Sequence, residues 1–158
     1  MLIDSKRPFF VILVFLILSL IGIIIYQRYL QFTEKNTITI YTGAGTVNIR
    51  VEYAVTPEER QKGLMNLSSL NKNFGMIFIF PEEKNQSFWM KNVLIPLDLI
   101  FISSNGKINE IATLNPCSAE PCSVYNSKNP AKYVIEVNAG STEKWKILES
   151  DILEIKGF

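Results

Sequence analysis

The sequence predicts a mainly β domain, either a compact β-sandwich or a closed β-barrel with two short helices, preceded by one N-terminal transmembrane helix. Three observations indicate this architecture. Many short apolar or alternating segments are separated by turn residues, only two stretches carry helix-start signals, and one long apolar run lies near the N-terminus. A chain of 158 residues has room for one such domain and an appendage.

The N-terminal apolar run extends from Phe9 to Ile25 and is interrupted only by Ser19 and Gly22. With Tyr26 it approaches the ~20 residues that cross a hydrocarbon core about 30 Å thick, and its residues favour insertion by roughly 6 kcal/mol in total. A buried core helix would have a polar face, and a cleaved signal peptide would end in a small-x-small site, which the bulky "IGIIIYQRYL" lacks. We therefore expect a cytoplasmic N-terminus over 1–8, an uncleaved anchor over 9–26, a juxtamembrane spacer over 27–36 and the β domain over 37–158.

The charges beside this run bias its orientation only slightly, because Lys6 and Arg7 precede it while Arg28 and Lys35 follow it. A short cationic N-terminus usually stays in the cytoplasm. The sequence therefore predicts a single-pass protein of the cell membrane whose C-terminal domain is extracytoplasmic.

The strands of the domain are predicted from two kinds of pattern. "VNIRVEY" over 47–53 alternates apolar and polar residues, which is typical of a strand with one buried face. "GMIFIF" and "LDLIFI" have the length and composition of fully buried strands. Asn105 and Gly106 predict a hairpin turn into "KINEI", and "KYVIEV" and "DILEI" are the later strands.

The two helices are predicted from their first residues. In "TPEERQKGLM", Thr56 is an expected N-cap, Pro57 suits the first helical position and Glu59 completes a capping box, while Gly63 can end the helix. "STEKW" predicts a second short helix beginning near Ser141. We see no internal repeat and no low-complexity tract.

The composition excludes several classes of function. The chain has no histidine, which removes the usual general base, the usual member of a catalytic triad and the commonest zinc ligand. Sixteen basic and fifteen acidic residues leave a net charge of +1, so we expect no nucleic-acid partner. Cys117 and Cys122 are the only cysteines, and without histidine two thiols cannot complete a four-ligand zinc site. We expect no metal or other cofactor.

The same two cysteines favour a local disulfide if the domain faces an oxidising compartment. Closing so short a loop would stabilise the fold by roughly 2 kcal/mol in the chain-entropy model. Two free buried cysteines are the alternative.

Asp98 lies within the long apolar passage "QSFWMKNVLIPLDLIFI". Both faces of the strand that begins beside it are apolar, so the strand is expected to be central and the carboxylate to need partners. On a structural interpretation, Lys91, Asn92 and nearby backbone N–H groups bind Asp98 and fasten the "KNVLIP" loop to the sheet. On a functional interpretation, the loop forms a ligand pocket edged by Asp98, Lys91 and Asn92, with Trp89 and Phe88 as its apolar wall.

Five segments, in this order, resemble the DUF192 family: "TPEERQKGLM", "GMIFIFP", "SFWMKNVLIPLDLIFI", "PCSAEPC" and "KYVIEVNAG". The resemblance covers nearly everything from Thr46 onward, and "FWMKN" followed by "IPLD" is its most specific part. It implies a compact β-sandwich or barrel and brings no established activity, substrate or catalytic residue. Relatives commonly have an arginine in "GLMxR", where this chain reads "GLMNLSSL", so a ligand role for that arginine would not transfer.

Three functions follow as hypotheses. The first is a membrane-anchored extracytoplasmic module that binds an envelope protein or glycan and does no chemistry. The second is a hydrolase of envelope glycans or peptides that uses Asp98 and a second carboxylate, Glu82, Glu83 or Glu110, about 5 to 10 Å away. The third is a structural partner of another envelope protein, which predicts an exposed apolar patch.

Overall fold

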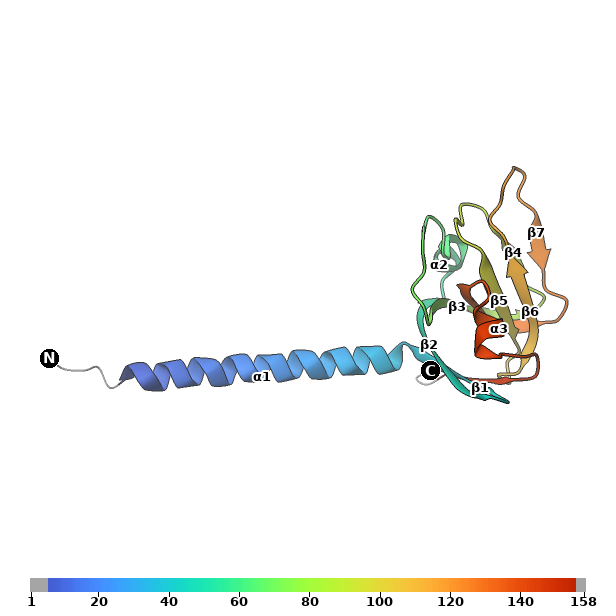
Figure 1. Cartoon of the computed structure of the whole chain (residues 1–158). Helices are drawn as coiled ribbons and strands as arrows, with labels where there is room; N and C mark the ends of the chain where they lie inside the picture. Colours follow the sequence, from blue (N-terminus) through green and yellow to red (C-terminus); the bar gives the residue numbers. More distant parts are fainter. Residues whose placement is uncertain (1–5, 156–158) are drawn as a thin grey trace. The chain divides into compact units, whose positions relative to one another are not determined.

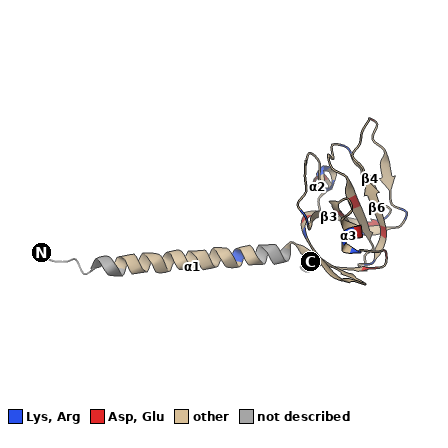
Figure 2. Ribbon diagram, viewed as in Figure 1, with Lys and Arg blue, Asp and Glu red and all other residues tan. Residues whose placement is uncertain are grey.

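A computed structural model describes residues 6–155 of the chain, with side chains over 10–30 and 36–154 (Figure 1). The chain divides into two compact units, Met1–Lys35 and Asn36–Phe158. The first contains α1 (Lys6–Lys35), in which Phe10–Leu30 is long and apolar enough to cross a membrane, as a membrane anchor or a signal sequence would be. Among its described side chains only Arg28 is charged (Figure 2). The helix continues through the residues expected to form a spacer.

The second unit is built on one seven-stranded sheet with the strand order β6-β5-β8-β3-β2-β1-β9. Neighbouring strands are antiparallel except β2 and β3, which are parallel. The strands are β1 (Thr37–Thr42), β2 (Gly45–Ala54), β3 (Phe74–Lys84), β5 (Leu97–Ile102), β6 (Ile108–Leu114), β8 (Ala131–Asn138) and β9 (Ile152–Ile155). A separate ribbon pairs β4 (Ser87–Trp89) with β7 (Val124–Asn126). The helices of this unit are α2 (Pro57–Lys62) and α3 (Ser141–Trp145).

The sheet curls into a half-barrel, because its two outermost strands meet at one end. The Leu153 N–H donates to the Gly106 carbonyl over 2.8 Å, and the Ile108 N–H donates to the Asp151 carbonyl over 2.9 Å. Gly106 has a φ of +84°, and a Cβ there would lie 2.7 Å from the Leu153 carbonyl oxygen, so the closure needs glycine. Of the two expected architectures, the observed sheet is the barrel-like one, closed at one end only.

Two apolar clusters cover the two faces of this sheet. The inner cluster lies inside the curl and includes Trp145 and Ile147 from the α3 region together with residues from all seven strands, among them Ile49, Ile77 and Ile100. The outer cluster lies between the opposite face, the β4–β7 ribbon and the segment around α2, and it includes Leu64, Met76, Phe78, Phe88, Leu99 and Phe101. β5 is an interior strand between β6 and β8, and all six of its residues are buried.

The local sequence patterns predict most of these elements. In β2, Ile49 and Val51 are buried while Asn48, Arg50 and Glu52 are exposed. α2 has the expected Thr56 cap, its capping box and its end at Gly63. β1, β4 and β7 are additional strands that the sequence analysis does not anticipate.

Candidate functional site

Asp98 is 1% exposed and lies on the face of β5 that looks into the curl. Its carboxylate accepts hydrogen bonds from the Thr113 hydroxyl (2.7 Å), the Thr142 hydroxyl (2.8 Å) and the Thr142 N–H (3.0 Å). Thr142 belongs to the first turn of α3, where backbone N–H groups lack helical partners, and the preceding Gly140 offers no side-chain cap. Asp98 therefore caps α3 from a neighbouring strand and fastens it to the sheet.

The prediction that Lys91 and Asn92 bind Asp98 is wrong, because its partners in the structure are Thr113 and Thr142. Lys91 forms an ion pair with Glu120 at 3.1 Å, and Asn92 lies in the outer loop after β4. The Asp98 side chain points to the inner face of the sheet. It therefore fastens α3 and not the "KNVLIP" loop that it was expected to fasten.

The second carboxylates considered for a hydrolase do not join Asp98. Glu110 is in register with Phe101, so it lies on the outer face of the sheet, opposite to Asp98. It accepts hydrogen bonds from the Tyr125 hydroxyl and from the Lys128 N–H (2.7 Å). Glu82 and Glu83 are exposed near the end of β3. Among the side chains that the structure describes, none of these three carboxylates pairs with Asp98.

Another carboxylate, Glu136 of β8, is buried in a different way. It is 6% exposed and lies on the outer face, in register with Met76 of β3 and Leu99 of β5. The described part of the chain gives its carboxyl group no hydrogen-bond or ion-pair partner. Every fully shielded side-chain nitrogen or oxygen in that part has a partner, so the Glu136 oxygens must keep a little exposure.

That exposure comes from a cleft of about 300 Å³, which we call the Glu136 cleft. The segment around α2 forms one wall with Leu64 and Met65, and β4 forms the other with Phe88 and Trp89. Phe78, Phe80 and Glu136 contribute from the sheet, while Arg60 and Lys62 of α2 are the other charged lining residues in the described part.

Burial raises the pKa of the Glu136 carboxyl from 4.5 to about 8. The side chain is therefore mostly protonated at neutral pH, and it ionises only in mildly alkaline conditions. An unpaired ionisable group in a cleft is a frequent mark of a functional site, because burial without a partner costs stability.

Of the four ligand-binding residues predicted from the sequence, three lie in or beside this cleft and one does not. Trp89 is 43% exposed and lines it. Lys91 and Asn92 line an adjoining shallow hollow that shares Trp89 with the cleft. Asp98 lies on the other face of the sheet, so the structure brings three of the four candidates to one region.

The DUF192 family model, described as "Uncharacterized ACR, COG1430", matches residues 39–155. The chain belongs to the DUF192 family. The Glu136 cleft lies wholly inside the matched DUF192 region.

Two UPF0127 proteins are similar to this DUF192 chain. One from Thermococcus gammatolerans is 32% identical over 105 residues, covering 65% of this chain and 64% of the relative. One from Thermococcus kodakarensis is 28% identical over 106 residues, covering 66% and 63%. The chain thus spans under two thirds of the length of these curated relatives.

Two solved structures share the DUF192 fold seen here. A protein from Sinorhizobium meliloti, described as a "putative transcription regulator", has a TM-score of 0.69 and 36% identity, covering 75% of this chain and 91% of its own. A protein of unknown function from Novosphingobium aromaticivorans has a TM-score of 0.69 and 31% identity, covering 75% and 83%. The relatives confirm the fold and the family, and they bring no established activity to the cleft.

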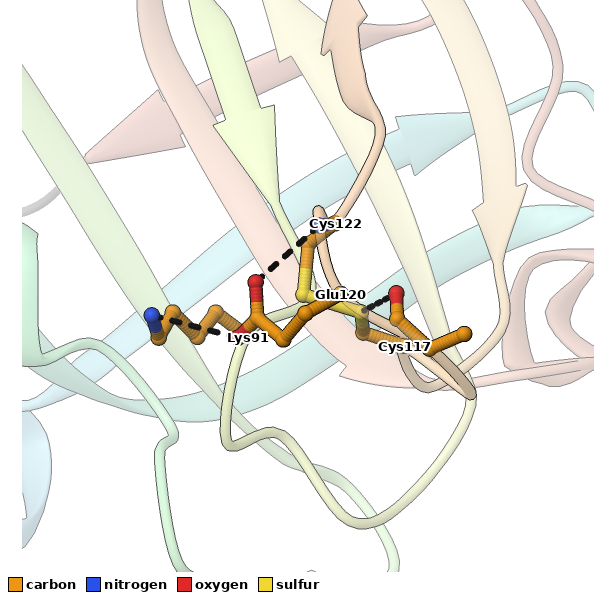
Figure 3. Close-up of a disulfide and its surroundings, with 5 residues drawn as sticks. Lys91, Cys117, Glu120 and Cys122 are labelled. Atoms are coloured by element: carbon orange, nitrogen blue, oxygen red, sulfur yellow. Dashed lines mark hydrogen bonds and ion pairs between the residues drawn. A yellow bond between two sulfur atoms is a disulfide. The ribbon is translucent and has the colours of Figure 1, made fainter.

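A disulfide joins Cys117 to Cys122 in the loop before β7 of the DUF192 domain. Figure 3 shows the ion pair between Lys91 and Glu120 beside it. The Glu120 carboxylate also accepts a hydrogen bond from the Cys122 N–H over 3.3 Å. The disulfide loop is therefore tied to the loop that follows Trp89, at the edge of the candidate region.

We expect this disulfide in protein isolated without reductant. Mass spectrometry of unreduced, alkylated material should show the peptide with Cys117 and Cys122 two hydrogens lighter than its reduced form. Reduction should lower the free energy of unfolding by roughly 2 kcal/mol. Alkylation of both thiols in freshly isolated, unreduced protein would contradict the expectation.

Sequence reasoning missed Glu136, although a signal was present. "KYVIEV" has apolar residues on both faces, with Val134 beside Glu136 on one and Ile135 and Val137 on the other. A carboxylate in a strand with two apolar faces is expected to be buried and to need partners, as was argued for Asp98.

Proposed function

We propose that this DUF192 chain is a membrane-anchored, extracytoplasmic binding module that receives its ligand in the Glu136 cleft and does no chemistry of its own. The observation that supports binding is the buried carboxyl group at an apolar cleft, which has no partner among the described residues, because a bound ligand can supply the missing partner. An envelope protein or an envelope glycan is the partner that we expect to present the ligand group.

Binding explains the cleft better than catalysis does. General acid–base chemistry needs a second group that can exchange protons near neutral pH or a positioned nucleophile. Besides Glu136, the charged side chains lining the cleft in the described part are Arg60 and Lys62, and the chain has no histidine. The apolar walls instead offer contact area, which is what a binding site requires.

The binding proposal can be tested with methyl NMR spectra of the full chain in detergent micelles. Small molecules and peptides from the host envelope should be added as fractions. We expect some fractions to shift the methyl signals of Leu64 and Val93, which line the cleft. The methyl signals of Val51 and Leu153, in the inner cluster, are the matched control. Fractions that leave both sets unmoved would contradict the proposal.

The orientation of the chain in the membrane is also testable. The apolar segment of α1 should anchor the chain and leave the domain outside the cytoplasm, because the short N-terminus carries Lys6 and Arg7. Protease added to intact cells or spheroplasts, as the envelope requires, should digest the domain. Digestion only after lysis would show that the orientation is the reverse.

A further inference from the structure

The Glu136 carboxyl needs a hydrogen-bond donor that the described part of the chain does not supply. Its cross-strand neighbours, Met76 and Leu99, are apolar, and so is Val134, two residues before it on the same face. In its ionised form a carboxylate offers about four acceptor positions and no donor. A cationic donor would satisfy both the charge and the hydrogen bonds of this group.

The walls of the cleft suit a cation carried on an alkyl chain. Phe88 packs edge-to-face against Phe78, with ring centroids 5.3 Å apart. Two further rings already hold cations of the chain itself, since the Arg60 guanidinium lies 5.3 Å from the Phe80 centroid and the Lys91 ammonium 5.8 Å from that of Trp89. Aromatic faces attract ammonium groups, more strongly where water is excluded.

The two cations of α2 leave Glu136 free for such a ligand. Arg60 is engaged by backbone, because its guanidinium donates to the Val55 carbonyl and to the Ile79 carbonyl, the latter over 3.0 Å. Neither Arg60 nor Lys62 lowers the pKa of Glu136, which burial alone raises. Within the described part of the chain, the carboxyl therefore has no charge partner.

We infer that the Glu136 cleft binds a protonated aliphatic amine, with its ammonium group against the Glu136 carboxylate and its alkyl chain between the aromatic walls. This inference rests on the proposed function and specifies the class of ligand. Binding exchanges one proton for the ammonium, because the carboxyl proton leaves to solvent when the cation enters. A lysine side chain of a polypeptide and a free alkylamine share this chemistry.

The experiment uses the full chain in uncharged detergent micelles and follows the Leu64 and Val93 methyl signals during titration. The probes are n-butylamine, 1-butanol as its neutral analogue and Nα-acetyl-lysine amide as the polypeptide form. Because the free carboxyl ionises near pH 8, the affinity for n-butylamine should rise about tenfold from pH 7 to pH 9. A neutral ligand that accepts a hydrogen bond from protonated Glu136 would instead bind more weakly at pH 9 than at pH 7.

Glu136→Gln should remove this rise and most of the n-butylamine affinity, while Glu52→Gln, on the exposed side of β2, should change neither. Arg60 and Lys62 are present in both proteins, so the difference in affinity between the wild type and Glu136→Gln reports on Glu136 alone. If 1-butanol binds as tightly as the amine at pH 9, the amine inference fails and the cleft still binds ligands. If neither Nα-acetyl-lysine amide nor n-butylamine nor 1-butanol shifts the cleft signals, the amine inference fails, while the proposed function still depends on the result with the envelope fractions. Tighter binding of the lysine amide than of n-butylamine would identify a polypeptide as the source.

Discussion

Glu136→Gln is expected to stabilise the domain, and the gain should grow as the pH rises from about 4.5 to about 8. Below this range the glutamate is protonated in both the folded and the unfolded chain. Within it, the unfolded chain ionises while the folded chain keeps its proton, so the wild type loses stability with rising pH. Above it the loss is complete, and the upward pKa shift corresponds to roughly 3 to 5 kcal/mol in the free energy of unfolding.

Denaturant unfolding of the segment 36–158 at pH 5 and pH 9 measures this effect. The unit contains both apolar clusters, so we expect it to fold without α1. The variant should unfold at a higher denaturant concentration than the wild type at pH 9 and should differ much less at pH 5. Glu52→Gln is the matched control for removing one carboxylate from an exposed site. Equal pH dependence in the wild type and in Glu136→Gln would refute the argument.

Removal of another buried carboxylate, Asp98, should change the stability in the opposite direction. Asp98→Asn keeps the shape and weakens charge-assisted hydrogen bonds, at a cost of roughly 1 to 3 kcal/mol. Asp98→Leu leaves the Thr142 N–H without its acceptor at the start of α3, so it should cost more, about 3 kcal/mol or above. Loss of α3 packing would also loosen Trp145 and Ile147 from the inner cluster.

The same unfolding experiment at neutral pH decides this second prediction. Thr142→Val removes the hydroxyl donor and keeps the backbone one, so it should be less damaging than Asp98→Leu. In a double-mutant cycle, Asp98→Asn and Thr142→Val should show a coupling energy, because the two side chains bond directly. An unfolding midpoint that stays unchanged or rises in Asp98→Leu would reject the fastening role.

The comparison of these two residues shows how far local sequence patterns extend. Apolar residues on both faces predict that the strand holding Asp98 lies inside the sheet, and the same pattern is present around Glu136, where the prediction was not made. Whether each is bonded depends on segments far away in the chain. Asp98 meets Thr142, 44 residues further on, while Glu136 faces α2, which precedes it by more than 70 residues.

The elements that sequence reasoning missed have a related cause. β4 and β7 contain three residues each, which is too short for a periodic signal. The parallel pairing of β2 with β3 depends on the crossover through α2, and no local pattern specifies it. By contrast, the capping box of α2 is wholly local, and it was predicted residue by residue.

The position of β9 has a consequence for how the domain folds. β9 pairs with β1, so the Tyr41 hydroxyl donates to a carboxylate 113 residues later, that of Glu154, and β9 also bonds the Gly106 turn that closes the curl. Contacts of such long sequence separation form late, because a large loop must be ordered before they stabilise anything. In a chain translocated from its N-terminal end, the edge of β1 that pairs with β9 stays unpaired until β9 is present. An unpaired strand edge can pair with other chains. The domain should therefore close in one late cooperative step, when β9 arrives.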